Sequence, residues 1–157
     1  MLRECKLFDI SRIYFVINEA ACAYDGVLPV DCYHQPYMSM DELEREMKRV
    51  TFYGWTEDGE LVGVMGIEPV KDVTLIRHAY VLTQWQNKGI GSALLEQLIK
   101  LCQTSRLLVG TWTANTGAIR LYQRYGFRLQ ANKDELLRTY WDISPRQIET
   151  SIAMERM

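Results

Sequence analysis

The sequence predicts an α/β fold in which a β-meander is followed by a β-α-β-α segment. Three runs with the pattern of β-strands follow one another with only short turns between them: Thr51 to Trp55, Glu60 to Glu68 and Val73 to Leu82. A helical repeat then begins near Gly89, and a short apolar run of the buried-strand type, Leu107 to Thr111, leads into another helical segment. This order of elements defines the predicted fold class.

The segment before the meander is expected to hold one strand and two helices. Leu2 to Phe8 has the pattern of a short strand. A first helix is indicated by apolar residues at helical spacing: Ile13, Tyr14, Ile17, Ala20 and Ala21. The second helix, Asp41 to Arg49, is preceded by Ser39, with Glu42 three residues later, which is the capping-box pattern of a helix start. A turn-rich segment, Tyr24 to Met38, joins the two helices.

The C-terminal part is expected to add a helix and a closing strand. Lys133 to Trp141 is helical in pattern, and Ser144-Pro145 then turns the chain. Gln147 to Glu155 alternates and indicates a strand, with four residues on one face: Ile148, Thr150, Ile152 and Met154. The helix is expected to complete the core. Two alternatives are that it covers a substrate site or builds a homodimer contact.

Length and composition favour a single domain from residue 1 to residue 157. A chain of 157 residues with 48% hydrophobic residues can bury a substantial core. The net charge of -2 argues against a nucleic-acid-binding surface. Three arginines at four-residue spacing, Arg120, Arg124 and Arg128, are therefore expected to form a solvated helix face.

No membrane, metal or disulfide role is expected. The N-terminal segment MLRECKLFDISR lacks the apolar core of a signal peptide, and the longest apolar run, Leu61 to Ile67, is too short to cross a bilayer. Cytoplasmic residence is the expectation that follows. The four cysteines, Cys5, Cys22, Cys32 and Cys102, show no metal-ligand spacing, so neither a zinc site nor a disulfide framework is indicated.

The most informative motif is the loop Gln86-Asn87-Lys88-Gly89-Ile90-Gly91-Ser92, which lies between a predicted strand and a predicted helix. A helix start has unpaired backbone N–H groups and the positive end of the helix dipole, and glycines let an anion approach the backbone closely. Lys88 adds a mobile positive charge. The loop therefore predicts a cradle for a pyrophosphate group. The alternative is a tight turn in which the glycines serve only for packing.

Two other phosphate loops do not fit this motif. A Walker loop needs a lysine followed by Ser or Thr after the glycines, whereas Lys88 precedes them. A dinucleotide-binding fingerprint needs a third small residue where this chain has Leu94. A nucleotide-triphosphate site is accordingly a distant alternative.

The remaining pattern, Q-x-x-G-x-G, resembles the acyl-CoA loop of the GCN5-related N-acetyltransferase (GNAT) superfamily. Further along, Asn115 to Phe127, which contains Tyr122 and Gly126, is similar to the second half of that family's signature. The resemblance implies a central twisted mixed sheet with helices on both faces and a splay between strands 4 and 5. It also implies direct transfer of an acetyl group from acetyl-CoA to a primary amine in a ternary complex, with no metal.

The resemblance further implies which residues contact acetyl-CoA and its thiolate. The loop residues Gln86, Asn87, Lys88, Gly89, Ile90, Gly91 and Ser92 would hold the pyrophosphate, and the backbone of Val81 would contact the pantetheine. Asn115 would hold the pantetheine or the acyl region. Residues seven apart lie on one helix face, so Asn115 and Tyr122 are expected to point together. Tyr122 would protonate the departing thiolate.

The acceptor side is expected to involve four residues. Strand alternation places Arg77 on the same face as Val81 and His78 on the other, so Arg77 would pair with a substrate carboxylate. Glu68, at the end of the second meander strand, is the preferred general base, either directly or through a water. Tyr24 and His34 belong to the aromatic segment where the family builds its acceptor pocket.

Two classes of function follow from these motifs. The first is an N-acetyltransferase that acts on a small molecule or on a peptide or protein N-terminus. The second is a non-catalytic acyl-CoA-binding sensor or regulatory module, because a fold and a cofactor site do not guarantee turnover. Tyr122 favours the enzyme, since a binding module has no need of a phenol that donates a proton. The amine acceptor, the acyl chain length and the oligomeric state stay open.

Overall fold

The computed structural model describes all residues from Met1 to Met157. The chain forms two compact units. The first unit consists of Met1–Glu68 and Arg77–Leu101, and the second consists of Pro69–Ile76 and Cys102–Met157. Seven strands are hydrogen-bonded in the order β1-β2-β3-β4-β5-β7-β6, and two long strands, β3 (Glu60–Val70) and β4 (Val73–Val81), run through both units. This mixed sheet confirms the predicted α/β class.

The strands of the first unit pair antiparallel. β1 (Leu2–Glu4) pairs with β2 (Thr51–Glu57), and β2 pairs with β3. The predicted first strand was too long, because a 3-10 turn, η1 (Leu7–Asp9), takes up its second half. The cause is Asp9, whose carboxylate accepts the backbone N–H of Lys6 at 2.8 Å and so bends the chain out of the strand.

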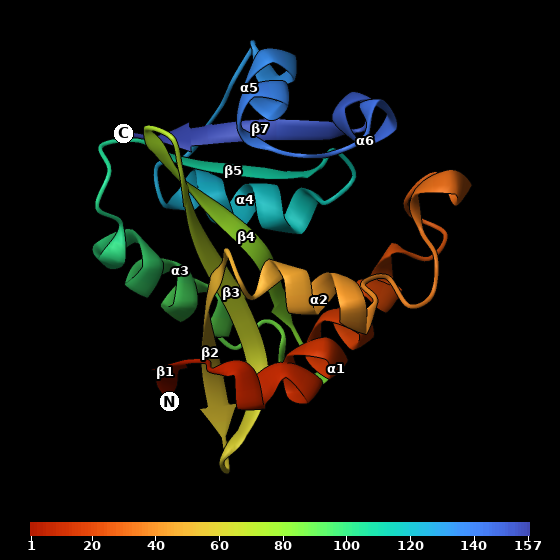
Figure 1. Ribbon diagram of the computed structural model, residues 1–157, viewed down its shortest axis with the longest axis vertical. Helices are drawn as coiled ribbons and strands as arrows, with labels where there is room; N and C mark the ends of the chain where they lie inside the picture. Colours follow the sequence, from red (N-terminus) through yellow and green to blue (C-terminus); the bar gives the residue numbers. More distant parts are fainter. The chain divides into compact units, whose positions relative to one another are not determined.

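Three helices complete the first unit: α1 (Ile10–Ala21), α2 (Met40–Glu46) and α3 (Ile90–Leu101). α1 and α2 lie against each other (Figure 1). The predicted cap of α2 is present, since the Glu42 backbone N–H donates to Ser39 Oγ at 3.1 Å. Three further 3-10 turns are η2 (Cys22–Tyr24), η3 (Val30–Cys32) and η4 (Thr83–Trp85).

In the second unit, β5 (Leu107–Trp112) pairs on one side with β4 and on the other with β7 (Ser151–Arg156), which also pairs with β6 (Arg128–Leu129). Thr74–Ile76 of β4 pair with Leu107–Val109 of β5 in parallel. The predicted splay would lie beyond that stretch, where β4 belongs to the first unit and β5 to the second. It stays a prediction. The other helices are α4 (Thr116–Arg124), α5 (Lys133–Tyr140) and α6 (Pro145–Glu149).

The prediction for the C-terminal strand was wrong in its first part. Gln147 to Glu149 lie in α6, and the strand starts only at Ser151. A local helix signal explains the difference: the Gln147 backbone N–H donates to Ser144 Oγ at 3.1 Å, and Pro145 occupies the first turn, where its missing N–H costs nothing. Within β7, Ala153 and Met154 are both fully buried, so both faces of the strand are covered.

The prediction that the helix after β6 completes the core is confirmed. α5 lies beside β7 (Figure 1). Its residues Leu136 and Leu137 are buried in one cluster with Leu75, Leu108 and Ala153 of the sheet. None of the helices is both long and apolar enough to span a membrane.

Candidate functional site

The loop before α3 is open to solvent and holds two left-handed backbone positions. Asn87 has φ +61° and Gly89 has φ +84°. A Cβ atom built on Gly89 would meet no heavy atom within 4 Å. Gly89 is therefore not a packing glycine, which was the alternative interpretation of the motif. Its backbone is free to be approached closely from outside.

The first turn of α3 supplies hydrogen-bond donors next to Gly89. The helix begins at Ile90, and the Gly89 carbonyl accepts the Ala93 N–H at 3.0 Å as the first bond of the helical ladder. The N–H groups ahead of Ala93 have no acceptor within the helix. Lys88 is exposed beside them. These donors, the dipole of a twelve-residue helix and the lysine suit an anion.

The loop is held in place by three hydrogen bonds within the first unit. Gln86 Nε2 donates to the Val81 carbonyl at 2.9 Å, and the Leu82 N–H donates to the Val62 carbonyl at 2.9 Å. The Thr83 N–H donates to Glu19 Oε1 on α1 at 2.8 Å. The side chain of Gln86 thus fixes the loop to the end of β4, and Val81 lies at that junction as predicted from the motif.

The second motif lies in the second unit and differs from its prediction in one respect. Asn115 is the N-cap of α4 rather than a residue on its helical face. Its Oδ1 accepts the Ala118 N–H at 3.4 Å, and its Nδ2 donates to Thr111 Oγ1 at 3.3 Å. An amide that caps a helix is held away from helical φ and ψ, so the seven-residue spacing to Tyr122 does not describe one helix face.

Tyr122 lies near the end of α4 and is only 3% exposed. Its ring packs edge-to-face on Phe127, with ring centroids 5.6 Å apart. Gly126 has φ +89°, and the Phe127 N–H reaches back to the Tyr122 carbonyl at 3.1 Å, which is the expected left-handed helix ending. Tyr122 and Asn115 thus share α4 and its N-cap, whereas the glycine loop belongs to the first unit.

On the acceptor side, β4 contains a left-handed residue that the sequence pattern did not reveal. His78 has φ +54°, which is rare for a residue with a side chain. Arg77 Nη2 and His78 Nε2 both lie within hydrogen-bond distance of Glu46 Oε1, at 3.0 and 2.9 Å. The prediction that His78 faces away from Arg77 was wrong, because this conformation interrupts the alternation of the strand.

Arg77 is the centre of a buried charge cluster in the first unit. Its guanidinium donates to Glu68 Oε1 at 2.7 Å and to Glu46 Oε1 at 3.0 Å. Glu46 and Glu68 are 5% and 8% exposed. Arg49 also pairs with Glu46, and its Nε lies 3.9 Å from Glu68 Oε2. A substrate carboxylate could bind Arg77 only in competition with these two protein carboxylates.

The cluster is ionised at Glu46 and neutral at His78. Burial alone would raise the pKa of Glu46, but His78, then Arg77 and Arg49, outweigh it and hold that pKa at about 2. Burial lowers the pKa of His78, more than its bond to Glu46 raises it. Neutral His78 therefore carries its proton on Nε2 and donates it to Glu46. Sequence reasoning missed Glu46, since its position in a short helix gives no sign of the contact with β4.

Part of the aromatic segment gathers around Tyr80 of β4. The ring centroids of Tyr24 and Tyr37 lie 5.3 Å apart, and each lies 6.4 Å from that of Tyr80. Burial, followed by the neighbouring Tyr37 and Tyr24, raises the pKa of Tyr80 well above its usual value. His34 is exposed, and its Nδ1 lies 2.7 Å from the Pro36 carbonyl in its own loop. The structure thus brings Tyr24 against Tyr80 of β4 and leaves His34 in the loop.

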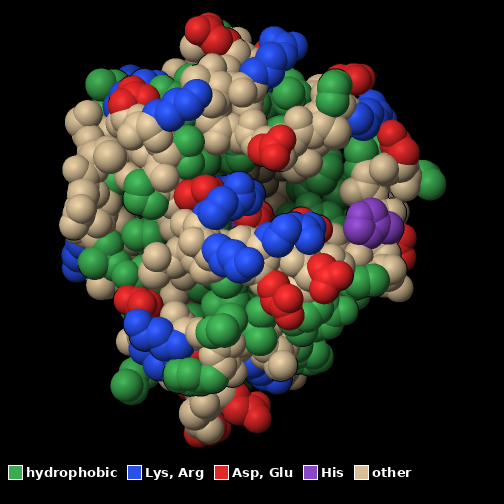
Figure 2. Space-filling view, viewed as in Figure 1, with side chains coloured by type: hydrophobic (Ala, Val, Ile, Leu, Met, Phe, Trp, Pro, Cys, Tyr) green, Lys and Arg blue, Asp and Glu red, His purple; other side chains and the backbone are tan.

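Acidic and basic side chains are interspersed over the face shown in Figure 2, in keeping with a net charge of -2. No group of three or more His, Cys, Asp or Glu side chains is arranged to hold a metal ion.

Comparison with known proteins places these motifs in a family. The model of the acetyltransferase (GNAT) family matches residues 11–127, which include both the glycine loop and Tyr122. An L-amino acid N-acetyltransferase of Escherichia coli is 28% identical over 81 residues, which cover 46% of this chain and 50% of that protein. A spermine/spermidine N(1)-acetyltransferase of Bacillus subtilis is 33% identical over 90 residues, which cover 49% of this chain and 59% of that protein. The chain thus spans 50% and 59% of the length of these two curated relatives.

The fold is also that of solved acetyltransferases. The crystal structure of PaiA N-acetyltransferase from Thermoplasma acidophilum, in complex with coenzyme A, superposes with a TM-score of 0.75 at 16% identity, covering 99% of this chain and 97% of that one. Because the family model matches well over half of the sequence, the chain belongs to the acetyltransferase (GNAT) family.

Proposed function

We propose that this protein transfers the acetyl group of acetyl-CoA directly to a primary amine, on a small molecule or on a peptide or protein N-terminus, in a ternary complex. The observation that carries the proposal is the open loop at Gly89 ahead of α3, within a chain of this family. Support comes from two relatives whose names state transfer to L-amino acids and to spermine or spermidine. Because acetyl-CoA is an intracellular metabolite, the proposed reaction belongs in the cytoplasm.

The loop would bind the pyrophosphate of acetyl-CoA. The residues from Gln86 to Ser92 offer backbone N–H groups at the start of α3, and the missing side chain of Gly89 lets phosphate oxygens approach them. Lys88 would add a charge-assisted contact. Val81, whose carbonyl is joined to Gln86, would contact the pantetheine through its backbone.

The two units would act as one domain in this reaction. β3 and β4 each run through both units, and the family match spans both. Tyr122 would then donate its phenolic proton to the thiolate of coenzyme A as the thioester breaks. Asn115 would serve chiefly to fix the start of α4, since its side chain caps that helix.

The acceptor amine would be bound and deprotonated at the charge cluster around Arg77. Glu68 has one oxygen engaged by Arg77 at 2.7 Å, whereas Oε2, which lies 3.9 Å from Arg49 Nε, would accept the proton, directly or through a water. Arg77 would position Glu68. Tyr24 and His34 would line the approach of the acceptor, with Tyr24 packed towards Tyr80.

The deciding experiment is release of free thiol from acetyl-CoA, measured across amino acids, polyamines and peptides for wild type, Tyr122→Phe and the control Tyr125→Phe on the neighbouring turn. Amine-dependent release is expected. Loss of a general acid should lower kcat by about 10²- to 10⁴-fold in Tyr122→Phe and leave acetyl-CoA binding intact. Tyr125→Phe should retain activity.

The sensor alternative makes a different prediction in the same experiment. Saturable binding of acetyl-CoA without turnover of any amine would favour a regulatory module. The ion pair between Glu68 and Arg77 fits that outcome, because it occupies one oxygen of the proposed base. If acetyl-CoA does not bind at all, the proposed role of Gln86 to Ser92 is wrong.

A further inference from the structure

The helix α1 is hydrogen-bonded to two loops of the first unit through neighbouring residues near its C-terminal end. Glu19 Oε1 accepts the backbone N–H of Thr83 at 2.8 Å. Asn18 exchanges two bonds with the backbone of Met38: its Nδ2 donates to the carbonyl at 3.0 Å, and its Oδ1 accepts the N–H at 2.9 Å. Successive residues of an α-helix point about 100° apart, so one helix can hold a loop on each of two sides.

These two loops are the ones that the proposed reaction uses. Thr83 begins the 3-10 turn η4, which leads directly into the glycine loop at Gln86. Met38 ends the aromatic segment, residues 24–38, part of which is proposed to line the approach of the acceptor. Adjacent residues of α1 therefore contact the cofactor side and the acceptor side separately.

The helix α1 is a firm support for both loops. Three of its side chains, Ile13, Val16 and Ile17, are fully buried. Nearer its N-terminal end, Arg12 Nε donates to the Leu61 carbonyl of β3 at 2.9 Å. Because close-packed interiors deform little, a hydrogen bond from α1 fixes the segment that it holds.

The backbone N–H of Thr83 finds its acceptor outside its own turn. The first N–H groups of a helical turn lack partners inside it, and the preceding residue, Leu82, provides no side-chain cap. The Glu19 carboxylate supplies an acceptor from 64 residues away, and a bond from a backbone N–H to a carboxylate is charge-assisted. Glu19 is only partly buried, so its removal should disturb the turn more than the core.

We propose that Glu19 is a positioning residue for acetyl-CoA. By holding Thr83, it fixes the start of the glycine loop, so that the N–H groups at the start of α3 are in place before the pyrophosphate binds. Preorganisation of this kind raises affinity, because it lowers the cost of ordering the loop on binding. Asn18 holds the aromatic segment instead and has no such effect on the cofactor. The inference rests on the proposed function, since it concerns acetyl-CoA at the same loop.

The experiment is titration calorimetry with coenzyme A, together with the KM of the amine that wild type acetylates fastest. Glu19→Ala should raise the dissociation constant of coenzyme A about five- to tenfold, as expected for the loss of one charge-assisted hydrogen bond, with a Tm close to that of wild type. Glu19→Gln keeps an oxygen that can accept the Thr83 N–H, so it should restore most of the affinity.

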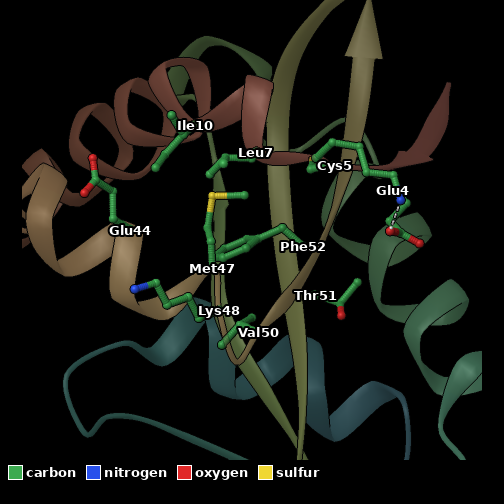
Figure 3. Close-up of a pocket in the computed structure, with 11 residues that line it drawn as sticks. Glu4, Cys5, Leu7, Ile10, Glu44, Met47, Lys48, Val50, Thr51 and Phe52 are labelled. Carbon is green, nitrogen blue, oxygen red and sulfur yellow. Dashed lines mark hydrogen bonds and ion pairs between the residues drawn. The ribbon is translucent and has the colours of Figure 1, made fainter.

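Two further variants of α1 are the controls. Ile10, in the first turn of the helix, lines a mainly apolar cavity of about 600 Å³ (Figure 3). It lies about 14 Å along the helix axis from Glu19. Ile10→Ala enlarges this cavity and should lower the Tm, but it should leave the dissociation constant of coenzyme A unchanged. Asn18→Ala should raise the KM of the amine without changing that constant.

The results separate this inference from the proposed function. If wild type binds coenzyme A and Glu19→Ala binds it equally well, the positioning role is wrong and the proposed acetyl transfer is untouched. The role is also wrong if Glu19→Gln binds no more tightly than Glu19→Ala, or if Ile10→Ala and Asn18→Ala weaken the binding as much. If wild type does not bind coenzyme A, both the proposed function and the role of Glu19 fail.

Discussion

At the scale of single residues, Gly89 connects backbone conformation to cofactor recognition. Its φ of +84° is a conformation that favours glycine, and the space where a side chain would lie is empty. A substitution there combines two separable effects. One is backbone strain, which acts on stability, and the other is a side chain in the space proposed for phosphate, which acts on binding.

Gly59 separates these effects, because it has φ +81° and the same empty surroundings in the turn between β2 and β3. Gly89→Ala and Gly59→Ala should each lower the unfolding free energy by about 1 kcal/mol, as measured by urea denaturation. Only Gly89→Ala should weaken acetyl-CoA binding in calorimetry, by about tenfold or more. Equal effects of both variants on binding would argue against the pyrophosphate role of the loop.

At the scale of secondary-structure elements, α5 is held by core packing. Leu137 is 1% exposed and lies in the apolar cluster of the second unit, where it also approaches the backbone of Gly110. This packing distinguishes a structural helix from a lid over the substrate, since a lid would contribute little to the stability of the fold.

Leu137→Ala should therefore lower the unfolding free energy by about 2–5 kcal/mol, because it leaves a cavity in a close-packed cluster. The control is Leu129→Ala on β6, whose side chain is 52% exposed and should change stability by less than about 1 kcal/mol. Chemical denaturation measures both. A Leu137→Ala protein of unchanged stability and altered amine KM would instead indicate a lid.

The elements also show what the sequence could predict. Strands of the meander, α3 and the cap of α2 follow from apolar spacing and local capping signals, and these were predicted. The helix α6 differs from the prediction, because Ser144 and Pro145 carry a helix start signal while the residues after them alternate as in a strand. The contact of Glu46 with Arg77 and His78 joins residues 31 and 32 positions apart, and no local pattern encodes such a contact.

At the scale of the whole molecule, stability should depend on pH through the charge cluster. Glu46 has a folded-state pKa of about 2, below its ordinary 4.5, so the stability that it contributes is present above pH 4.5 and is lost as pH falls towards 2. His78 has a lowered pKa, so the unfolded chain gains a proton first as pH falls below 6.5, which also disfavours the fold.

Both groups thus act in the same direction, and the unfolding free energy should fall in two stages on acidification from pH 7. The shift of Glu46 corresponds to a contribution on the order of 3 kcal/mol. Urea denaturation at a series of pH values measures the effect, with Glu60→Gln as the control, since Glu60 is an exposed carboxylate. In Glu46→Gln, which should be less stable at neutral pH, the stage below pH 4.5 should shrink. If it keeps its full size, the acid sensitivity arises elsewhere.

The buried cluster also has an evolutionary consequence. Arg77 bridges two carboxylates that come from different elements, α2 and β3, and its loss would leave Glu68 without its hydrogen-bonded cation inside the protein. Replacement of Arg77 alone should therefore cost stability, whereas joint replacement of Arg77 and Glu68 by uncharged residues avoids the unpaired charge but removes the proposed base. Among homologous sequences, the residue at position 77 should therefore change together with the residues at positions 46 and 68.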